Sequence, residues 1–151
     1  MRKIISTLAA SAALSVSLFG LAQPAQAATA GAELRNQDTG LCVDRREDPE
    51  RPVSAFTTEC DGGSTQHWVY STSDLTIRTP DGRCLGTGST SGIFVVDCAG
   101  GALVHWGLTA DGRIHQLDWG IGCIEDYRTE WLTWGGCDNN PNEIWSSPAT
   151  V

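Results

Sequence analysis

The stretch CDGGSTQHW, at residues 60–68, decides how the rest of this sequence is interpreted. The same frame, a cysteine with a tryptophan eight residues later, returns as CAGGALVHW at residues 98–106 and as CDNNPNEIW at residues 137–145. The three tryptophans are therefore 38 and 39 residues apart. A period of this length is typical of a fold in which each repeat is one supersecondary unit that completes its core only with its neighbours.

A second set of cysteines precedes the three frames. Cys42, Cys84 and Cys123 lie 18, 14 and 14 residues before the cysteine that opens each frame, and each is followed by an apolar residue and then a polar or small one. Six cysteines are an even number, which favours disulfides in an exported chain. Zinc is the alternative, but no Cys-x-x-Cys pair or compact Cys/His cluster is present to bind it. Six cysteines allow fifteen pairings, and the spacing does not choose among them.

Residues 1–27 have the layout of a secretory signal peptide. Arg2 and Lys3 precede an uncharged apolar run from Ile4 to Leu21, and a small-x-small cleavage site follows at residues 25–27. An uncleaved membrane anchor is the alternative, which Pro24 and the small residues disfavour. Cleavage after Ala30 is a second option. We expect a secreted protein whose single domain spans residues 28–151.

Composition excludes several function classes. Removal of residues 1–27 leaves eight basic and 18 acidic residues, a balance that disfavours nucleic acid and anionic membranes as partners. Lys3 is the only lysine in the chain, so the mature protein has no Schiff-base lysine, P-loop lysine or Ser-Lys dyad. We expect no cofactor, no metal and no catalytic residues. Glu125 and Asp126 are neighbours along the chain and do not form a facing pair of carboxylates.

The segments between the cysteines have the pattern of short strands. Residues 75–79 and 113–117 alternate apolar and polar side chains, and Asp-Gly and Gly-Gly turns separate such segments. Three units of about 40 residues leave no free sheet edge when they close into one body. A propeller typically needs at least four blades. The sequence therefore predicts an all-β fold of the β-trefoil type, with repeats at about 33–71, 72–109 and 110–147.

Residues 66–68, Gln-His-Trp, form the Q-x-W motif, and residues 104–106 and 143–145 are degraded copies of it. Residues 40–44 carry a cysteine–apolar–Asp element. With these motifs the chain resembles the ricin-B-type β-trefoil lectin family from Glu33 to Trp145. The resemblance implies one disulfide within each repeat: Cys42–Cys60, Cys84–Cys98 and Cys123–Cys137. It also implies a non-catalytic, sugar-binding domain.

In that family each repeat can carry a sugar site made of four positions: an Asp, an aromatic residue, an Asn and a Gln. Repeat one keeps Asp44 and Gln66, with Thr58 and Thr65 at the other two positions. Repeat three keeps Asn142 and has Glu125 in place of the Asp. Its aromatic and Gln positions hold Gly135 and Glu143. Repeat two has Gly86, Val96, Leu103 and Val104, so we expect it to be structural only.

Repeat three also carries additional aromatic residues: Trp119, Tyr127, Trp131 and Trp134. Alternation with Leu132 predicts that Trp134 points inward, while Trp131 points outward and Trp119 and Tyr127 lie on flanking loops. These rings either cover the hairpin cap of the trefoil or form a flat binding patch for a sugar or a protein partner, beside Glu125, Asp126, Glu130 and Asn142.

Two hypotheses follow. The first is a secreted carbohydrate-binding module with one or two weak sites in repeats one and three, formed by Asp44, Gln66, Glu125, Asn142 and Trp131. The alternative is a non-catalytic adaptor, subunit or inhibitor that docks another secreted protein through Trp119, Tyr127 and Trp131.

Overall fold

The computed structural model describes residues 31–46, 53–88, 90–120, 122–128 and 131–151. The predicted signal peptide, residues 1–27, lies outside the described residues. The strands are β1 (Ala32–Glu33), β2 (Cys42–Arg46), β3 (Val53–Thr58), β4 (His67–Ser71), β5 (Thr76–Arg78), β6 (Cys84–Thr87), β7 (Ile93–Val96), β8 (Trp106–Leu108), β9 (Ile114–Gln116), β10 (Cys123–Glu125), β11 (Thr133–Gly135) and β12 (Ala149–Thr150). Two single 3-10 turns, η1 (Ser64–Gln66) and η2 (Pro141–Glu143), precede the tryptophans of repeats one and three.

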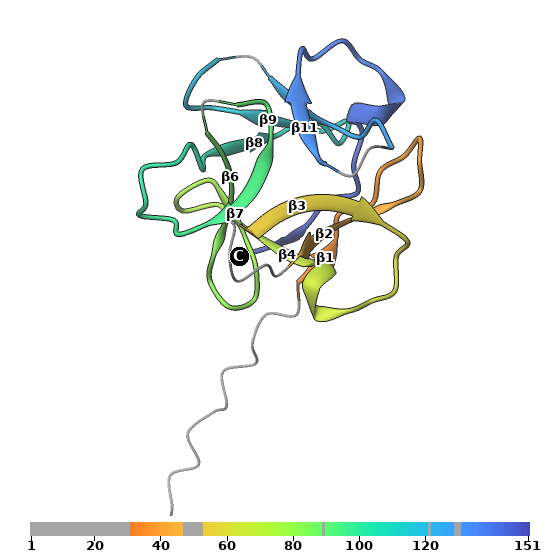
Figure 1. Cartoon of the computed structure of the whole chain (residues 1–151). Helices are drawn as coiled ribbons and strands as arrows, with labels where there is room; N and C mark the ends of the chain where they lie inside the picture. Colours follow the sequence, from red (N-terminus) through yellow and green to blue (C-terminus); the bar gives the residue numbers. More distant parts are fainter. Residues whose placement is uncertain (1–30, 47–52, 89, 121, 129–130) are drawn as a thin grey trace, which may run out of the picture.

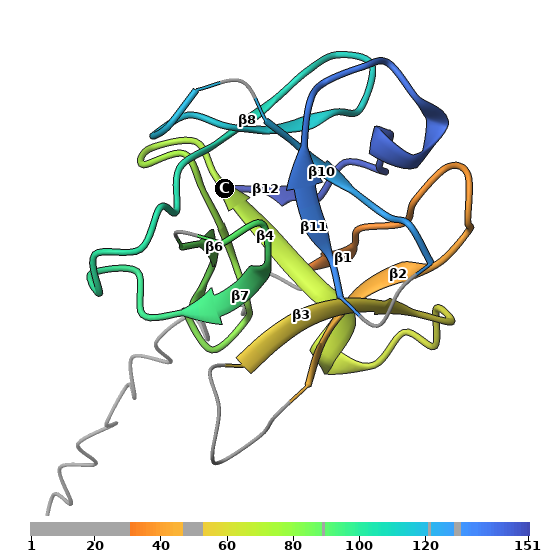
Figure 2. The same ribbon diagram turned by 45° about the horizontal axis from the view of Figure 1, so that its top comes forward.

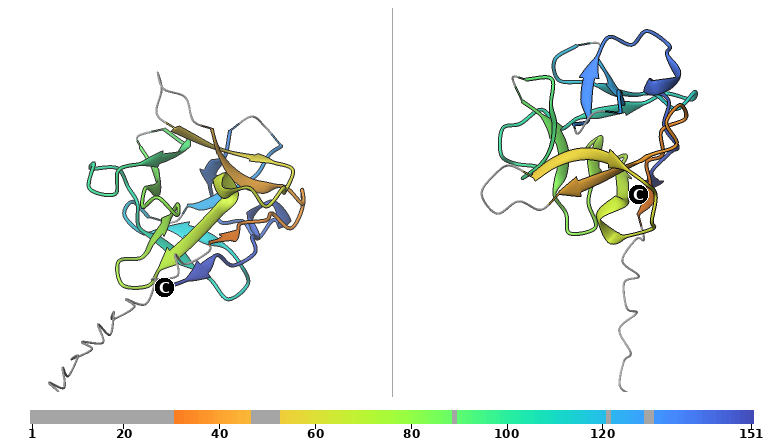
Figure 3. Two further views of the ribbon diagram at one scale, coloured as in Figure 1. Left: turned by 90° about the horizontal axis from the view of Figure 1, so that it is seen from below. Right: turned by 45° about the vertical axis from the view of Figure 1, so that its right-hand side comes forward.

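The strands form two sheets, of order β1-β4-β5-β6-β7-β3-β2 and β11-β10-β9-β8 (Figure 1). Nearly all pairs are antiparallel; the exception is β12, which pairs with β4 in parallel and joins the end of the chain to the first repeat (Figure 2). The three repeats surround a common centre in each view (Figures 1 and 3). The all-β, β-trefoil prediction is confirmed. No helix in the described part of the chain is long and apolar enough to cross a membrane.

One hairpin recurs in each repeat with the same register. Its first strand begins at the first cysteine, which pairs with the residue two positions before the second cysteine: Cys42 with Thr58, Cys84 with Val96, and Cys123 with Gly135. This register brings the two cysteines of each repeat together. The disulfides are Cys42–Cys60, Cys84–Cys98 and Cys123–Cys137, with Cα–Cα distances of 5.0–5.1 Å. The pairing that the family resemblance implied is confirmed.

The repeated tryptophans attach each hairpin to the core in the same way. Each indole N–H donates to the carbonyl of the residue after the first cysteine: Trp68 to Val43 (2.9 Å), Trp106 to Leu85 (2.8 Å) and Trp145 to Ile124 (3.0 Å). All three side chains are buried, together with the aliphatic residues of the core: Leu34, Val43, Ile77, Leu85, Ile93, Val95, Ile114, Ile124 and Leu132. A buried indole contributes both its large apolar area and a satisfied N–H, which explains why this residue recurs.

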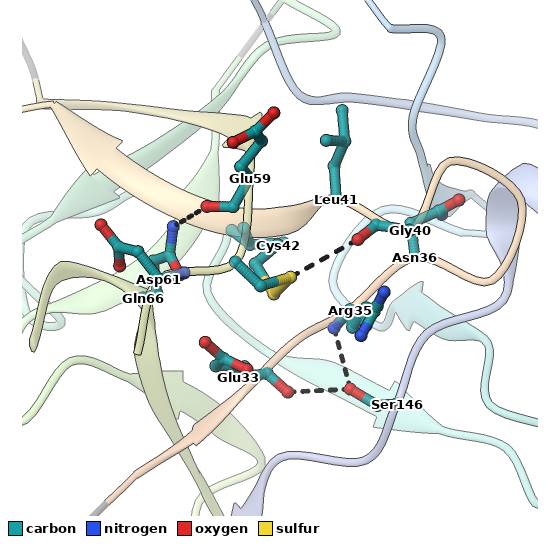
Figure 4. The surroundings of a disulfide bond; sticks show 12 residues. Glu33, Arg35, Asn36, Gly40, Leu41, Cys42, Glu59, Asp61, Gln66 and Ser146 are labelled. Carbon is teal, nitrogen blue, oxygen red and sulfur yellow. Dashed lines mark hydrogen bonds between the residues drawn. A yellow bond between two sulfur atoms is a disulfide. The ribbon is translucent and has the colours of Figure 1, made fainter. Parts of the chain in front are cut away.

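The first and third repeats are also tied together directly. Around the Cys42–Cys60 disulfide, Ser146 Oγ donates to the Glu33 carbonyl (2.8 Å) and accepts from the Arg35 backbone N–H (2.8 Å) (Figure 4). Ser146 follows the tryptophan of repeat three, whereas Glu33 and Arg35 begin repeat one. These bonds close the trefoil between its first and last repeats.

Candidate functional site

In repeat one the structure brings Asp44 and Gln66 together, but most of their polar atoms are used internally. Gln66 is fully buried; its Nε2 donates to Asp44 Oδ2 (3.1 Å) and to the Glu59 carbonyl (2.8 Å). Its Oε1 accepts from the Asp61 backbone N–H (2.9 Å) (Figure 4). Asp44, which is 8% exposed, also accepts from the Arg45 backbone N–H (2.6 Å). Gln66 therefore positions Asp44 and presents no polar atom of its own to solvent.

In repeat two the equivalent space is filled by aliphatic side chains. A Cβ placed on Gly86 would lie 3.0 Å from both Val104 Cγ1 and Val96 Cγ2, and 3.2 Å from the Leu103 carbonyl. Val104 is buried in the place that Gln66 occupies in repeat one. The position of the carboxylate is therefore closed by packing, and the structural role of this repeat stays a prediction.

In repeat three Glu143 takes the place of Gln66 and keeps half of its role. It is fully buried, and its Oε1 accepts from the Asp138 backbone N–H (2.8 Å). In both repeats this N–H belongs to the residue after the second cysteine. Glu143 Oε2 accepts a second backbone N–H, from Asn139 (3.1 Å). A carboxylate has no N–H to donate, so the bond that Gln66 makes to Asp44 has no equivalent here.

Glu125 takes the place of Asp44 and is 4% exposed. Gly135 on the paired strand provides the room for the longer side chain, because a Cβ there would lie 2.7–2.9 Å from the Glu125 carboxyl atoms. Burial raises the pKa of Glu125, and the nearby Glu143 and Asp138 raise it further, while a hydrogen bond from Tyr127 acts in the opposite direction. Repeat three therefore holds two buried carboxyl groups where repeat one has a carboxylate and an amide.

A groove of about 410 Å³ opens beside these groups, lined by Asp38, Asp126, Tyr127, Arg128, Asn140, Pro141 and Asn142. The Tyr127 side chain is 59% exposed. Its hydroxyl lies near the Glu125 carboxyl, and the interaction with Glu125 raises the pKa of Tyr127. The structure thus brings the predicted residues Glu125, Asn142 and Tyr127 to one place, with an aromatic ring open to solvent.

Asp126 is a buried residue that lines this groove. It is 3% exposed and accepts from Thr39 Oγ1 (2.6 Å), Thr57 Oγ1 (3.0 Å) and the Arg128 backbone N–H (2.9 Å). Thr39 and Thr57 belong to repeat one, so the groove lies at the boundary between the last repeat and the first. Asp126 and Arg128 flank Tyr127, and the hydrogen bonds that join them to each other and to repeat one fix the backbone that carries the ring.

The other aromatic residues lie elsewhere. Trp119 is 67% exposed and lines a separate hollow of about 210 Å³ with Thr87, Gly88, Gly101, Ala102 and Leu103. Trp131 is exposed and is not among the residues that line either hollow. Trp134 lies half-buried against Gly122 and the core, as predicted. Tyr127 and Trp119 therefore line two different hollows, and Trp131 lines neither of the two.

Within the described residues, one group of potential metal ligands is close enough to share an ion: Glu33, Cys42 and Cys60. The two sulfurs are bonded to each other, so neither is a thiolate that can coordinate a metal.

Comparison with known proteins identifies the family. The model of the ricin-type beta-trefoil lectin domain matches residues 30–146. This chain belongs to that family. The ricin-type lectin domain is a carbohydrate-binding module and is typically non-catalytic. No curated protein sequence matches the chain.

Solved structures agree with the fold of this lectin domain. It is similar to the β-trefoil lectin of the Vibrio vulnificus hemolysin/cytolysin, solved with N-acetyl-D-lactosamine bound, at a TM-score of 0.66 and 15% identity over 80% of this chain and 93% of that one. The Rhizoctonia solani agglutinin gives 0.59 and 15% identity, over 78% and 93% of the two chains. The Abrus precatorius agglutinin gives 0.61 and 19% identity, over 78% of this chain and 47% of that one. At these identities the likeness shows the fold alone.

Four residues that line the lectin domain's groove were missed from the sequence: Asp38, Arg128, Asn140 and Pro141. Asp38 comes from the first loop of repeat one, more than 80 residues before the rest of the groove. Asp126 was predicted to lie beside the aromatic patch, but its bonds to repeat one were not predicted. The alternation of strand side chains, which directs neighbours to opposite faces, could have placed Asp126 toward the adjoining repeat. No sequence signal indicated that Thr39 and Thr57 would be its partners.

Proposed function

We propose that this protein is a secreted carbohydrate-binding protein whose main sugar site is the groove of repeat three. The observation that carries the proposal is the exposed Tyr127 ring, which lies in a groove with the amides of Asn140 and Asn142. A flat ring suits the C–H face of a sugar, and amides and carboxylates suit its hydroxyls. The leader-like residues 1–27 support secretion.

A second, weaker site in repeat one is part of the proposal. Millimolar sugar binding corresponds to about 4 kcal/mol, and a hydrogen bond to a charged group supplies roughly 1.5–3 kcal/mol of such a total. Asp44 retains a small exposed area for such a bond, whereas Thr58 provides no ring for stacking. We therefore rank repeat one below repeat three.

A glycan array followed by titration calorimetry tests the site. Tyr127→Ala should weaken binding of the best glycan at least tenfold, because the ring provides the stacking surface. Trp119→Ala is the matched control, another exposed aromatic residue, and should leave sugar affinity unchanged. If Tyr127→Ala has no effect and Asp44→Ala abolishes binding, the main site belongs to repeat one.

The Trp119 hollow supports a second candidate function, docking of another exported protein. An exposed tryptophan beside Ala102 and Leu103 is the kind of anchor around which binding energy concentrates at protein interfaces. Trp119→Ala should then cost about 2 kcal/mol, roughly thirtyfold in affinity, in a pull-down from the native secretome. Tyr127→Ala is the control there. A partner that Trp119→Ala retains at full affinity would contradict this candidate.

A further inference from the structure

The groove of repeat three carries an excess of negative charge. Asp38 and Asp126 line it, and the buried Glu143 follows the lining residue Asn142 in the chain. Arg128 is the cation among its lining residues. The Arg128 guanidinium donates to the Asp38 carbonyl at 3.5 Å and stands 3.9 Å from Asp38 Oδ2, so the ion pair is loose and exposed. Such a pair is weak and a competing cation readily displaces it.

The buried carboxylates are held by neutral donors. Asp126 accepts from two threonine hydroxyls and one backbone N–H, and Glu143 accepts from two backbone N–H groups. None of these donors carries a charge, so the bonds place no cation beside the two carboxyl groups.

This charge is a property of one groove and not of the repeat framework. Glu143 corresponds to Gln66 in repeat one and to Val104 in repeat two. Asp126 corresponds to Thr87 in the hollow of repeat two, and Asp38 corresponds to Trp119. Acidic groups and an exposed aromatic ring therefore coincide in the groove of repeat three.

We propose that the repeat-three groove selects a sugar that carries a protonated amino group, such as the free hexosamine units of a deacetylated glycan. This inference rests on the proposed function of the same groove. An ammonium group donates three hydrogen bonds, which suits the exposed Asp38 carboxylate, and it is attracted to the face of the Tyr127 ring. An acetylated amine is neutral, so it is attracted neither to the carboxylate charge nor, as a cation would be, to the face of the ring. A uronate or other acidic sugar is repelled.

The test compares glucosamine oligomers with fully N-acetylated oligomers of the same length by titration calorimetry, at a pH where the amine is protonated. The amine form should bind at least tenfold more tightly at low ionic strength, and added salt should reduce the difference, because salt screens charges exposed at the groove. Asp38→Asn should lower the amine-to-acetyl ratio severalfold. Asp97→Asn, which removes an exposed carboxylate of repeat two, is the matched control and should leave the ratio unchanged.

The outcomes separate this inference from the function on which it rests. If acetylated or neutral sugars bind as well as the amine form, and Tyr127→Ala weakens them, the charge selection is wrong and the sugar site remains. A preference for the amine that Asp38→Asn does not change overturns the assignment to this groove. If no glycan binds at all, the proposed function fails and the inference fails with it.

Discussion

The hollows of repeats two and three occupy equivalent places and have opposite chemistry. Residues 87, 88, 101, 102 and 103 of repeat two line one, and the residues 39 positions later, 126, 127, 140, 141 and 142, line the other. The following repeat completes each hollow with a residue four positions before its first cysteine: Trp119 for repeat two and Asp38 for repeat three. In repeat two the lining is apolar apart from Thr87; in repeat three it is polar, acidic and carries Tyr127.

The difference shows that framework and ligand chemistry are separate in this fold. The disulfide, the hairpin register and the tryptophan hydrogen bond are the same in both repeats. The loop residues that project from this framework differ at almost every equivalent position. The same backbone framework therefore carries an apolar hollow in repeat two and a charged groove in repeat three.

The largest expected effect is on the shared framework. Trp106→Ala and Trp145→Ala should each lower the free energy of unfolding by about 3–5 kcal/mol, because each removes a buried indole and leaves a cavity. Urea denaturation of both variants measures the cost, with the exposed Trp119→Ala as the control near zero. If the two variants lose amounts of unfolding free energy that differ by more than the error of the measurement, the two tryptophans do not contribute equally to stability.

A smaller effect separates the two hairpins. Gly86→Ala places a methyl group against Val96 and Val104, which are packed and cannot move far, so we expect a loss of about 1–3 kcal/mol. Gly135→Ala meets the Glu125 carboxyl, the end of a flexible side chain that can turn away. Gly135→Ala should therefore cost less stability and should weaken sugar binding instead. Denaturation and calorimetry on both variants decide this, and equal losses of stability would contradict it.

The smallest effect is the pH dependence that Glu125 adds to repeat three. Burial raises its pKa in the folded protein above the value in the unfolded chain, so the folded state binds this proton more tightly. Its stabilising contribution is complete below about pH 4.5, the ordinary value, and is lost as the pH rises through the raised pKa. Glu125→Gln should remove that part of the decline in unfolding free energy with pH. Glu59→Gln, at an exposed carboxyl, is the control; identical profiles for the two variants would refute the assignment.

Much of the fold could be predicted because it depends on regularly spaced residues. The period of the Cys and Trp residues gave the repeats, and strand alternation placed Leu132 and Trp134 against the core. The family resemblance supplied the disulfide pairing. The site was predicted less completely. Glu125 and Asn142 were identified from their positions in the repeat, whereas the joint role of Asp38, Asp126 and Tyr127 was not.

The sequence by itself determined the three-fold frame, because six cysteines and three tryptophans at fixed spacing impose the same hairpin and the same buried contact in every repeat. Only the tertiary structure decided which loops meet. Asp38 joins Asn142, and Trp119 joins Leu103, across boundaries between repeats. Closure of the trefoil brings these residues together through contacts between distant segments, and no local pattern encodes such contacts. The framework can therefore be predicted from the sequence of each repeat separately, whereas a groove shared by two repeats forms only when the trefoil closes.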